Sequence, residues 1–260
     1  QETMFEHAFR ALDLVDGLEM SRAKAEVLLD VAILYTLAAD QERAIELASE
    51  ARRGAEALDL AELEARALAT IGASRTLSGD SGGLEDLRRS IEITEEIDSP
   101  LGSQHLGMLA DVECSLGHLA DCFELQARAR EHAERFGHTA HIQWLKAERV
   151  AECYWTGDWN VAVALADGFL SEAESGSGHF MEPYCHAVRG RIRLARGELA
   201  DALDDTLQAV EKARDSGEPQ MLCPALAVRA RALVAAGARD DAAQAAEELL
   251  ALWTEKLDLF

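Results

Sequence analysis

The stretch ARGELADAL, Ala195 to Leu203, places Gly197 between two helix-forming segments and Ala202 five residues further on. The same pair of small residues returns forty residues earlier in WTGDWNVAV, from Trp155, and forty residues later in VAAGARDDAA, from Val234. A glycine just past a helix supplies the left-handed conformation that ends it. The fixed interval therefore predicts a helical hairpin that is repeated along the chain.

Two series of mostly short side chains follow this period through the sequence. The first precedes each turn and runs Ala32, Gly72, Ala110, Val150, Gly190, Ala230; the second follows each turn and runs Ala44, Leu87, Cys122, Ala162, Ala202, Ala242. Two helices approach each other most closely where bulky side chains are missing, so we expect both series at helix contacts. One interval is longer because SGDSGG, Ser78 to Gly83, extends a turn. This segment lacks the strand and the lysine of a nucleotide loop, and we interpret it as a turn.

Composition favours an all-α protein and limits its partners. The chain of 260 residues has only 4 prolines and 5% aromatic residues, and 48% of it is hydrophobic, which is ample for a core. Its formal net charge of -23 argues against nucleic acid as a partner, because a phosphate backbone requires a concentrated basic surface, and it favours basic or polar partners. No apolar run approaches the ~20 residues that a membrane span needs. Five unclustered cysteines favour reduced thiols, and we expect the cytoplasm as the compartment.

The period divides the chain into a lone helix and six hairpins within a single domain. We expect the lone helix at 1–17 and the repeats at about 20–59, 60–99, 101–137, 139–176, 180–217 and 219–257. Both ends carry large apolar residues, at Met4–Val15 and Leu252–Phe260, where an array of repeats normally has a polar cap. We therefore expect that the chain was excised from a longer protein, or that its ends pack against each other or against a second copy to form a homodimer.

The repeats resemble those of the tetratricopeptide repeat family. The best match is VRGRIRLARGELADALDDTLQAV, Val188 to Val210, with small residues at Gly190, Gly197, Ala202 and Ala209. A unit of about forty residues is similar to the long variety in the sensor regions of maltose-operon-activator-type bacterial regulators and in helical arrays joined to ATPase or cyclase domains. The resemblance implies a right-handed α-solenoid whose inner face is lined by the first helix of each repeat and binds peptides.

The inner face of the carboxyl half carries the candidate binding residues. One inward position gives Arg191 and Arg231, and nearby inner positions give the aromatic residues Trp144, Tyr154 and Tyr184. Arginines beside aromatic rings bind a carboxylate or a phosphate by paired hydrogen bonds with stacking. The alternative is that both arginines pair with nearby acids such as Glu152 or Asp201, while the aromatic residues fill the core.

A second arginine series, Arg149, Arg189 and Arg229, lies on a different face of the first helices. Two residues along a helix turn a side chain by about 200°, so these arginines cannot point with Arg191 and Arg231. We expect them to bridge neighbouring repeats through acids on second helices.

No catalytic motif, cofactor site or complete metal site is evident. His132, His138 and His141 are close in sequence, but a closed zinc site needs four ligands and a catalytic one three protein ligands. A metal-dependent receptor or enzyme using the His132–His141 region is therefore the alternative function. Cys114 and Cys153 fall on helices expected to pack, and we interpret both as small apolar filler. The sequence predicts a non-catalytic interaction or effector-sensing module, with a protein, a peptide or a small anionic effector as its ligand.

Overall fold

The computed structural model of the chain is helical throughout the residues that it describes, which are 4–38, 40–176, 178–216 and 219–257. No strand occurs in these residues. In this described part of the chain, thirteen helices follow one another in the order α1 (Met4–Val15), α2 (Arg22–Leu37), α3 (Gln41–Ala57), α4 (Ala61–Leu77), α5 (Gly83–Glu96), α6 (Gly102–Ser115), α7 (Leu119–Phe136), α8 (Thr139–Thr156), α9 (Trp159–Glu174), α10 (Glu182–Arg196), α11 (Leu199–Ser216), α12 (Pro219–Ala235) and α13 (Arg239–Leu257). The predicted all-α fold is confirmed.

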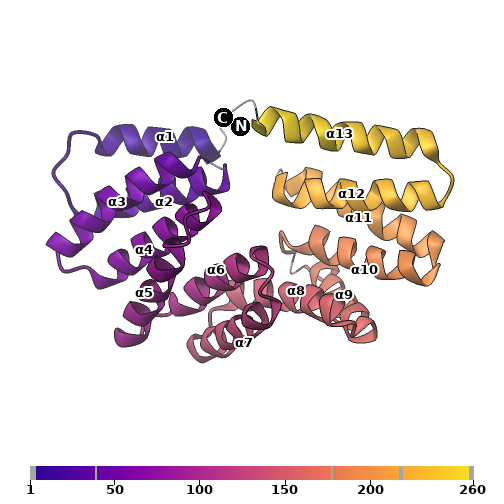
Figure 1. The fold of residues 1–260 in the computed structure, drawn as a ribbon, viewed down its shortest axis with the longest axis horizontal. Helices are drawn as coiled ribbons and strands as arrows, with labels where there is room; N and C mark the ends of the chain where they lie inside the picture. The colour runs from indigo at the N-terminus through magenta and orange to yellow at the C-terminus, as the bar shows by residue number, and fades with distance from the viewer. Residues whose placement is uncertain (1–3, 39, 177, 217–218, 258–260) are drawn as a thin grey trace. The chain divides into compact units, whose positions relative to one another are not determined.

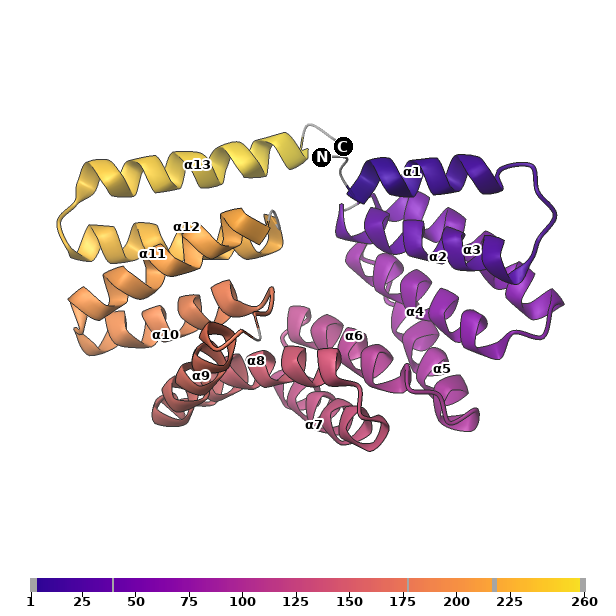
Figure 2. The same ribbon diagram turned by 180° about the vertical axis from the view of Figure 1, so that it is seen from behind.

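Helices pair with their neighbours in the chain, as Figures 1 and 2 show from opposite sides. The hairpins α2–α3, α4–α5, α6–α7, α10–α11 and α12–α13 each pack tightly, and α8 and α9 share one apolar core. First helices also pack on the first helix of the next hairpin, as α2 does on α4, α4 on α6 and α10 on α12. The single helix and six hairpins that the period predicts are therefore present.

By packing, the chain divides into two compact units, residues 1–141 and 142–260. The first unit contains α1 to α7, and the second contains α9 to α13 and all of α8 except its first three residues. The expectation of a single domain stays a prediction.

In the first unit, the small residues of the two series lie where helices touch. A Cβ atom on Gly72 of α4 would lie 2.6 Å from the carbonyl oxygen of Gly83 and 2.8 Å from the backbone nitrogen of Leu87, both on α5. Ala32 and Ala44 are fully buried between α2 and its neighbours. The missing side chains let these helices approach each other closely, as predicted.

The second unit follows the same rule. A Cβ atom on Gly190 of α10 would lie 2.9 Å from the Cγ2 atom of Thr206 on α11, and Ala202 is fully buried. Gly197 ends α10 with a φ of 78°, and Gly237, forty residues later, has the same φ of 78° after α12. Only glycine adopts this left-handed conformation at little cost, which explains why these turns repeat the residue.

Two sequence features fall partly outside the described residues. The first is Ala39, which stands in the sequence where later hairpins have a turn glycine. The second is the apolar carboxyl end, of which residues 258–260 are not described. Side chains of residues 253–257 are likewise not described. In the described part of the chain, no helix combines the length and the apolar character that crossing a membrane requires.

Candidate ligand-binding site

A hollow of about 640 Å³ opens on the first helices of the second unit. It is lined by Tyr154, Trp159, Arg191, Leu194, Ala195, Val228, Ala230, Arg231, Val234 and Ala235, which come from α8, the start of α9, α10 and α12. We call it the arginine pocket. Among the residues that the structure describes, no acidic one lines it, and apolar side chains form most of its wall. Its volume lies within the roughly 300–1,000 Å³ that is usual for small-molecule sites.

Arg191 and Arg231 occupy equivalent positions of successive first helices. Neither side chain forms an ion pair or a hydrogen bond with another residue in the part of the chain that the structure describes. The buried Nε–H group of Arg191 is among the few buried polar groups without a partner. A buried donor without an acceptor costs about 1–3 kcal/mol, and a bound acceptor recovers that cost. The arginine pocket therefore offers two guanidinium groups to an anion.

The aromatic side of the pocket is held in place by one hydrogen bond and one stacking contact. The rings of Tyr154 and Trp159 are stacked at 6.2 Å between centroids with an interplanar angle of 10°. The indole Nε1–H of Trp159 donates to the carbonyl oxygen of Tyr154 at 3.1 Å. Because the turn between α8 and α9 is short, the first residue of α9 folds back over the last turn of α8. These rings present a flat apolar surface beside the arginines.

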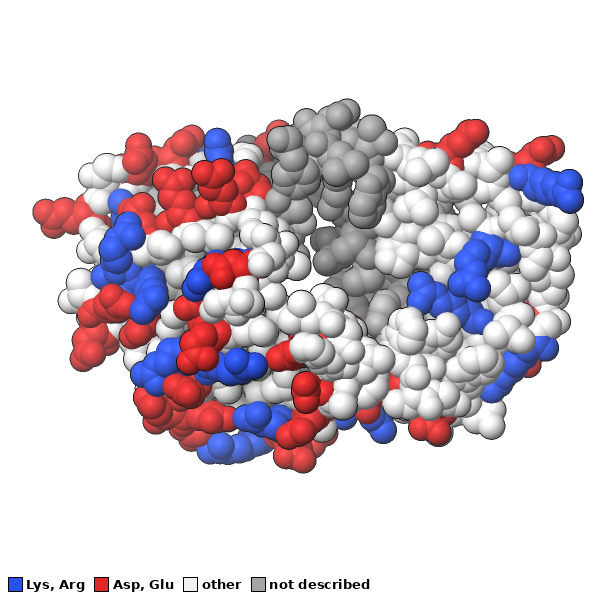
Figure 3. Space-filling view, in the orientation of Figure 1, with Lys and Arg blue, Asp and Glu red and all other residues white. Residues whose placement is uncertain are grey.

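Charge on the visible surface agrees with this arrangement. Figure 3 shows basic side chains gathered over α10 to α12, with few acidic side chains around them. Over the first unit in the same view, acidic and basic side chains are mixed. The chain as a whole has a net charge of -23, so its overall composition does not account for a local basic surface. Such a surface is the feature expected of a site that binds an anion.

The structure brings three of the five candidate binding residues together. Tyr154, Arg191 and Arg231 line the arginine pocket, whereas Trp144 and Tyr184 pack, half-buried, against the core shared by α8, α9 and α10. That core placement agrees with the alternative interpretation of these two rings. Their contact with a ligand stays a prediction.

The acids proposed as alternative partners of the two arginines are engaged elsewhere or are not joined to them. Glu152 accepts a short hydrogen bond from Arg149, one turn away on α8. Asp201 is exposed on α11, and among the described residues no ion pair connects it to Arg191 or Arg231. The pairing that would neutralise the arginines is absent from this part of the chain.

The sequence pattern does not indicate Trp159 or Val228, which line the pocket together with Leu194 and Val234. Trp159 begins a second helix, so a search restricted to first helices passes over it. Val234 is 63% exposed, and its apolar side chain forms part of the wall of the pocket. That exposure becomes visible only when α12 is placed in the fold.

Two members of the second arginine series bridge helices, as predicted, but only Arg189 does so through acids. Arg189 binds Asp205 of α11, with Nη2 2.6 Å from Oδ1, and also pairs with Asp167 of α9. Arg229 donates instead to the carbonyl oxygen of Leu203 and to the Thr206 hydroxyl on α11. Arg149 departs from the expectation, because its partner lies on its own helix.

Asp205 is fully buried at the centre of this contact. His186 Nδ1 lies 3.1 Å from Oδ1, and Arg193 Nη1 donates to Oδ2 at 2.8 Å. Burial raises the pKa of Asp205, but the hydrogen bonds from His186 and Arg189 outweigh burial and hold the pKa below its ordinary value. Internal partners therefore occupy both carboxylate oxygens of Asp205.

The histidines near the end of the first unit do not converge on one point. The ring of His132 stacks on Phe136 at 4.8 Å, while His138 and His141 stack on each other at 5.8 Å. His141 Nε2 lies 3.1 Å from the carbonyl oxygen of Ser103. Burial lowers the pKa of His141 to about 4, which keeps its ring neutral at pH 7. These side chains make internal contacts and form no metal-binding group among the described residues.

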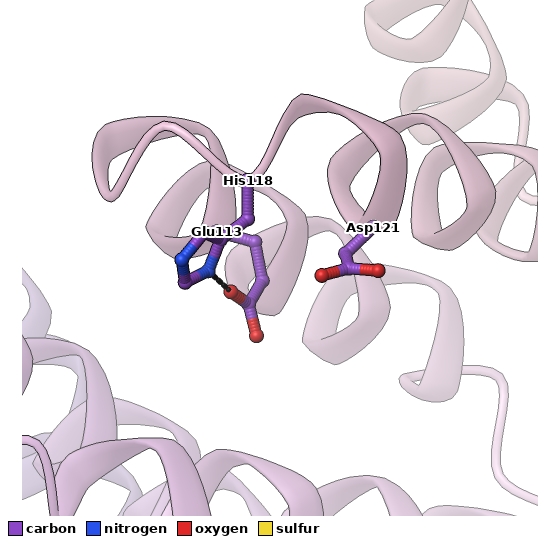
Figure 4. Close-up of side chains that lie close together, drawn as sticks. All are labelled: Glu113, His118 and Asp121. Carbon is purple, nitrogen blue, oxygen red and sulfur yellow. Dashed lines mark hydrogen bonds and ion pairs between the residues drawn. The ribbon is translucent and has the colours of Figure 1, made fainter.

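The one group of three possible metal ligands in the described residues lies elsewhere, at Glu113, His118 and Asp121 (Figure 4). His118 Nδ1 contacts Glu113 Oε2 at 2.7 Å, and Arg88 lies 3.6 Å from the other carboxylate oxygen. In Figure 4 no dashed line joins Asp121 to this pair, although one possible ligand atom of each of the three residues lies within 4.8 Å of the others. We interpret Glu113 and His118 as an acid–histidine pair that joins the ends of α6 and α7.

Two smaller expectations have different outcomes. The segment Ser78–Gly83 is a turn between α4 and α5, in which Asp80 accepts from the Gly82 backbone at 2.9 Å. Cys153 is buried, as predicted for apolar filler, but Cys114 is exposed. The expectation for Cys114 is therefore wrong, because its position on α6 turns outward from the hairpin core.

Comparison with known proteins identifies the fold but no close relative. No protein family model and no curated protein matches the sequence. Among solved structures, a Rap protein in complex with Competence and Sporulation Factor aligns with a TM-score of 0.74 at 15% identity, over 97% of this chain and 70% of that one. A signal transduction ATPase with numerous domains and a tetratricopeptide repeat sensor, from Pyrococcus horikoshii, aligns with a TM-score of 0.66 at 15% identity, over 98% of this chain and 41% of that one. The chain has the tetratricopeptide repeat fold.

A third solved structure, the putative kinesin light chain repeats of Podosopora anserina, aligns with a TM-score of 0.52 at 14% identity, over 73% of this chain and 93% of that one. At such identities the likeness establishes the fold alone. Within the tetratricopeptide repeat fold, α10 and α12 are the first helices of successive repeats. The arginine pocket therefore lies on the first-helix face that the resemblance assigns to ligands.

Proposed function

We propose that the chain is a non-catalytic interaction and sensing module that binds an acidic segment of a protein partner at the arginine pocket. The observation that carries the proposal is that Arg191 and Arg231 line one hollow without an acidic partner among the described residues. Guanidinium groups bind carboxylates through paired hydrogen bonds, and the apolar wall accommodates the side chains next to the acid.

The comparisons support an interaction role at a coarser level. One similar fold was solved with a bound factor, and another is the sensor of a larger signal transduction ATPase. By analogy, the chain serves as the sensor or scaffold segment of a larger bacterial regulatory protein in the cytoplasm.

A peptide selection tests this function. Random peptides displayed on phage are selected on the immobilised chain, and the enriched sequences are then synthesised. The account predicts enrichment of Asp or Glu next to apolar residues. Because hydrogen bonds to charged groups contribute about 1.5–3 kcal/mol, the double variant Arg191→Ala/Arg231→Ala should bind a selected peptide at least ~10-fold more weakly than the wild type.

The matched control is Arg196→Ala/Arg239→Ala, which removes the same charge at exposed positions outside the pocket. This variant should retain the affinity of the wild type. Equal losses in both double variants would mean that net charge, and not the arginine pocket, determines binding.

A further inference from the structure

We infer that the arginine pocket is also an effector site for a small amphipathic monoanion, that is, a flat apolar body carrying one carboxylate. The inference rests on the proposed function to the extent that both use Arg191 and Arg231. It adds a class of small molecule and a form of regulation, because an acid bound in the pocket occupies the groups that a partner peptide needs.

The apolar part of this ligand follows from the wall of the pocket. Val234 is 63% exposed and Leu194 is partly exposed, so an apolar body placed against them removes apolar surface from water. The stacked rings of Tyr154 and Trp159 form a flat side. A planar aromatic ligand fits such a side better than a branched one, because aromatic rings pair favourably in offset-stacked or edge-to-face arrangements.

The single charge follows from two opposing features. The unpartnered Nε–H of Arg191 and the exposed guanidinium of Arg231 favour an anion inside the pocket. The net charge of -23 on the whole chain opposes the approach of a ligand with many negative charges. A monoanion gains the local attraction while it meets the smallest long-range repulsion.

Three probes of graded chemistry separate these contributions. 2-Naphthoate has the apolar body and the carboxylate, 2-naphthamide has the body without the charge, and acetate has the charge without the body. Binding to the intact chain is measured by isothermal titration calorimetry. We expect saturable 1:1 binding of 2-naphthoate, at least 10-fold weaker binding of 2-naphthamide, and no measurable binding of acetate.

Variants place the binding in the pocket. Arg191→Ala/Arg231→Ala should bind 2-naphthoate no better than the wild type binds 2-naphthamide. Val234→Asp puts an acid on the exposed wall and should lower the affinity for 2-naphthoate at least 5-fold. Arg196→Ala/Arg239→Ala should leave that affinity unchanged. Circular dichroism of each variant confirms that it is folded. Equal affinity for 2-naphthoate and 2-naphthamide, or retention of 2-naphthoate binding by the Arg191→Ala/Arg231→Ala variant, overturns the inference.

Competition separates this inference from the proposed function. Saturating 2-naphthoate should displace a selected acidic peptide from the wild-type chain. If acidic peptides bind but 2-naphthoate does not, the effector site is wrong and the peptide function stands. If 2-naphthoate binds through the arginines but the selection yields no acidic peptides, the effector site stands and the peptide function is wrong.

Discussion

Arg189 of α10 and Asp205 of α11 form a buried ion pair, with Nη2 2.6 Å from Oδ1. Arg189 also reaches Asp167 of the preceding second helix, so this one side chain joins two successive hairpins. The pair shows how a residue type that repeats every forty positions serves structure on one face of the first helix. Two residues further along, Arg191 points to the arginine pocket instead.

Asp205→Ala should destabilise the second unit strongly. Removing one partner of a buried pair leaves the other charge uncompensated, which costs about 3–5 kcal/mol. Here Arg193 loses its acceptor, and Arg189 keeps only its pairing with Asp167. Urea unfolding followed by circular dichroism measures the loss. Asp201→Ala, an exposed change on the same helix, should shift the free energy of unfolding by less than about 0.5 kcal/mol. Similar effects of the two variants would contradict a structural role for Asp205.

Two glycine-to-alanine changes should have opposite signs. Gly72→Ala places a Cβ atom 2.6 Å from the Gly83 carbonyl oxygen, so α4 and α5 must separate, at a cost of about 1–3 kcal/mol. Gly168 lies in the exposed middle of α9 with nothing within 4 Å of a Cβ atom. Gly168→Ala should therefore stabilise the chain by up to about 1 kcal/mol, the difference in helix propensity. Thermal unfolding of the two variants is the measurement, and a stabilised Gly72→Ala would refute the close contact.

Much of the fold could be predicted from the sequence, because the forty-residue period places small residues where helices must approach closely and glycines where helices must end. The small residues at Ala32, Gly72, Ala44 and Ala202 are buried at helix contacts, and the glycines after α10 and α12 adopt the left-handed conformation. The equivalence of Arg191 and Arg231 follows from the same period.

The site was only partly predictable from the sequence. Whether a side chain is buried or lines the pocket depends on how the helices pack, and the forty-residue period does not specify that packing. Trp159 folds back from a second helix over Tyr154, which spacing along first helices does not anticipate. Trp144 is forty residues from Tyr184, but both rings pack against the core and do not line the arginine pocket. Cys114 shares the helix α6 with buried neighbours, yet it is exposed.

Acidification should destabilise the first unit through His105. This ring is 3% exposed, and burial lowers its pKa to about 4, below the ordinary value of 6.5. Between pH 6.5 and 4, the unfolded chain therefore binds a proton at His105 that the folded chain does not bind. The contribution of His105 to the free energy of unfolding is unchanged above pH 6.5 and decreases as the pH drops toward 4. The slope approaches about 1.4 kcal/mol per pH unit for this residue. Urea midpoints at pH 7, 6 and 5 should fall less steeply in His105→Phe, and parallel curves would rule out this role of His105.

Thiol reactivity should follow the exposure of the cysteines. Cys114 is exposed, whereas Cys122, Cys153 and Cys185 are buried, and burial raises the pKa of the Cys185 thiol. In a native chain treated with Ellman's reagent, we expect Cys114 to react first and the three buried thiols to react only on unfolding. The fast phase should disappear in Cys114→Ser. Its survival at full amplitude would show that another thiol is accessible.

The Nε–Hε signals of the arginines test the central claim most directly. In ¹H–¹⁵N spectra of the intact chain titrated with 2-naphthoate or with a selected acidic peptide, the signals of Arg191 and Arg231 should shift in a saturable way, while those of Arg196 and Arg239 stay in place. Ligand binding that leaves the Arg191 and Arg231 signals unmoved would contradict the account.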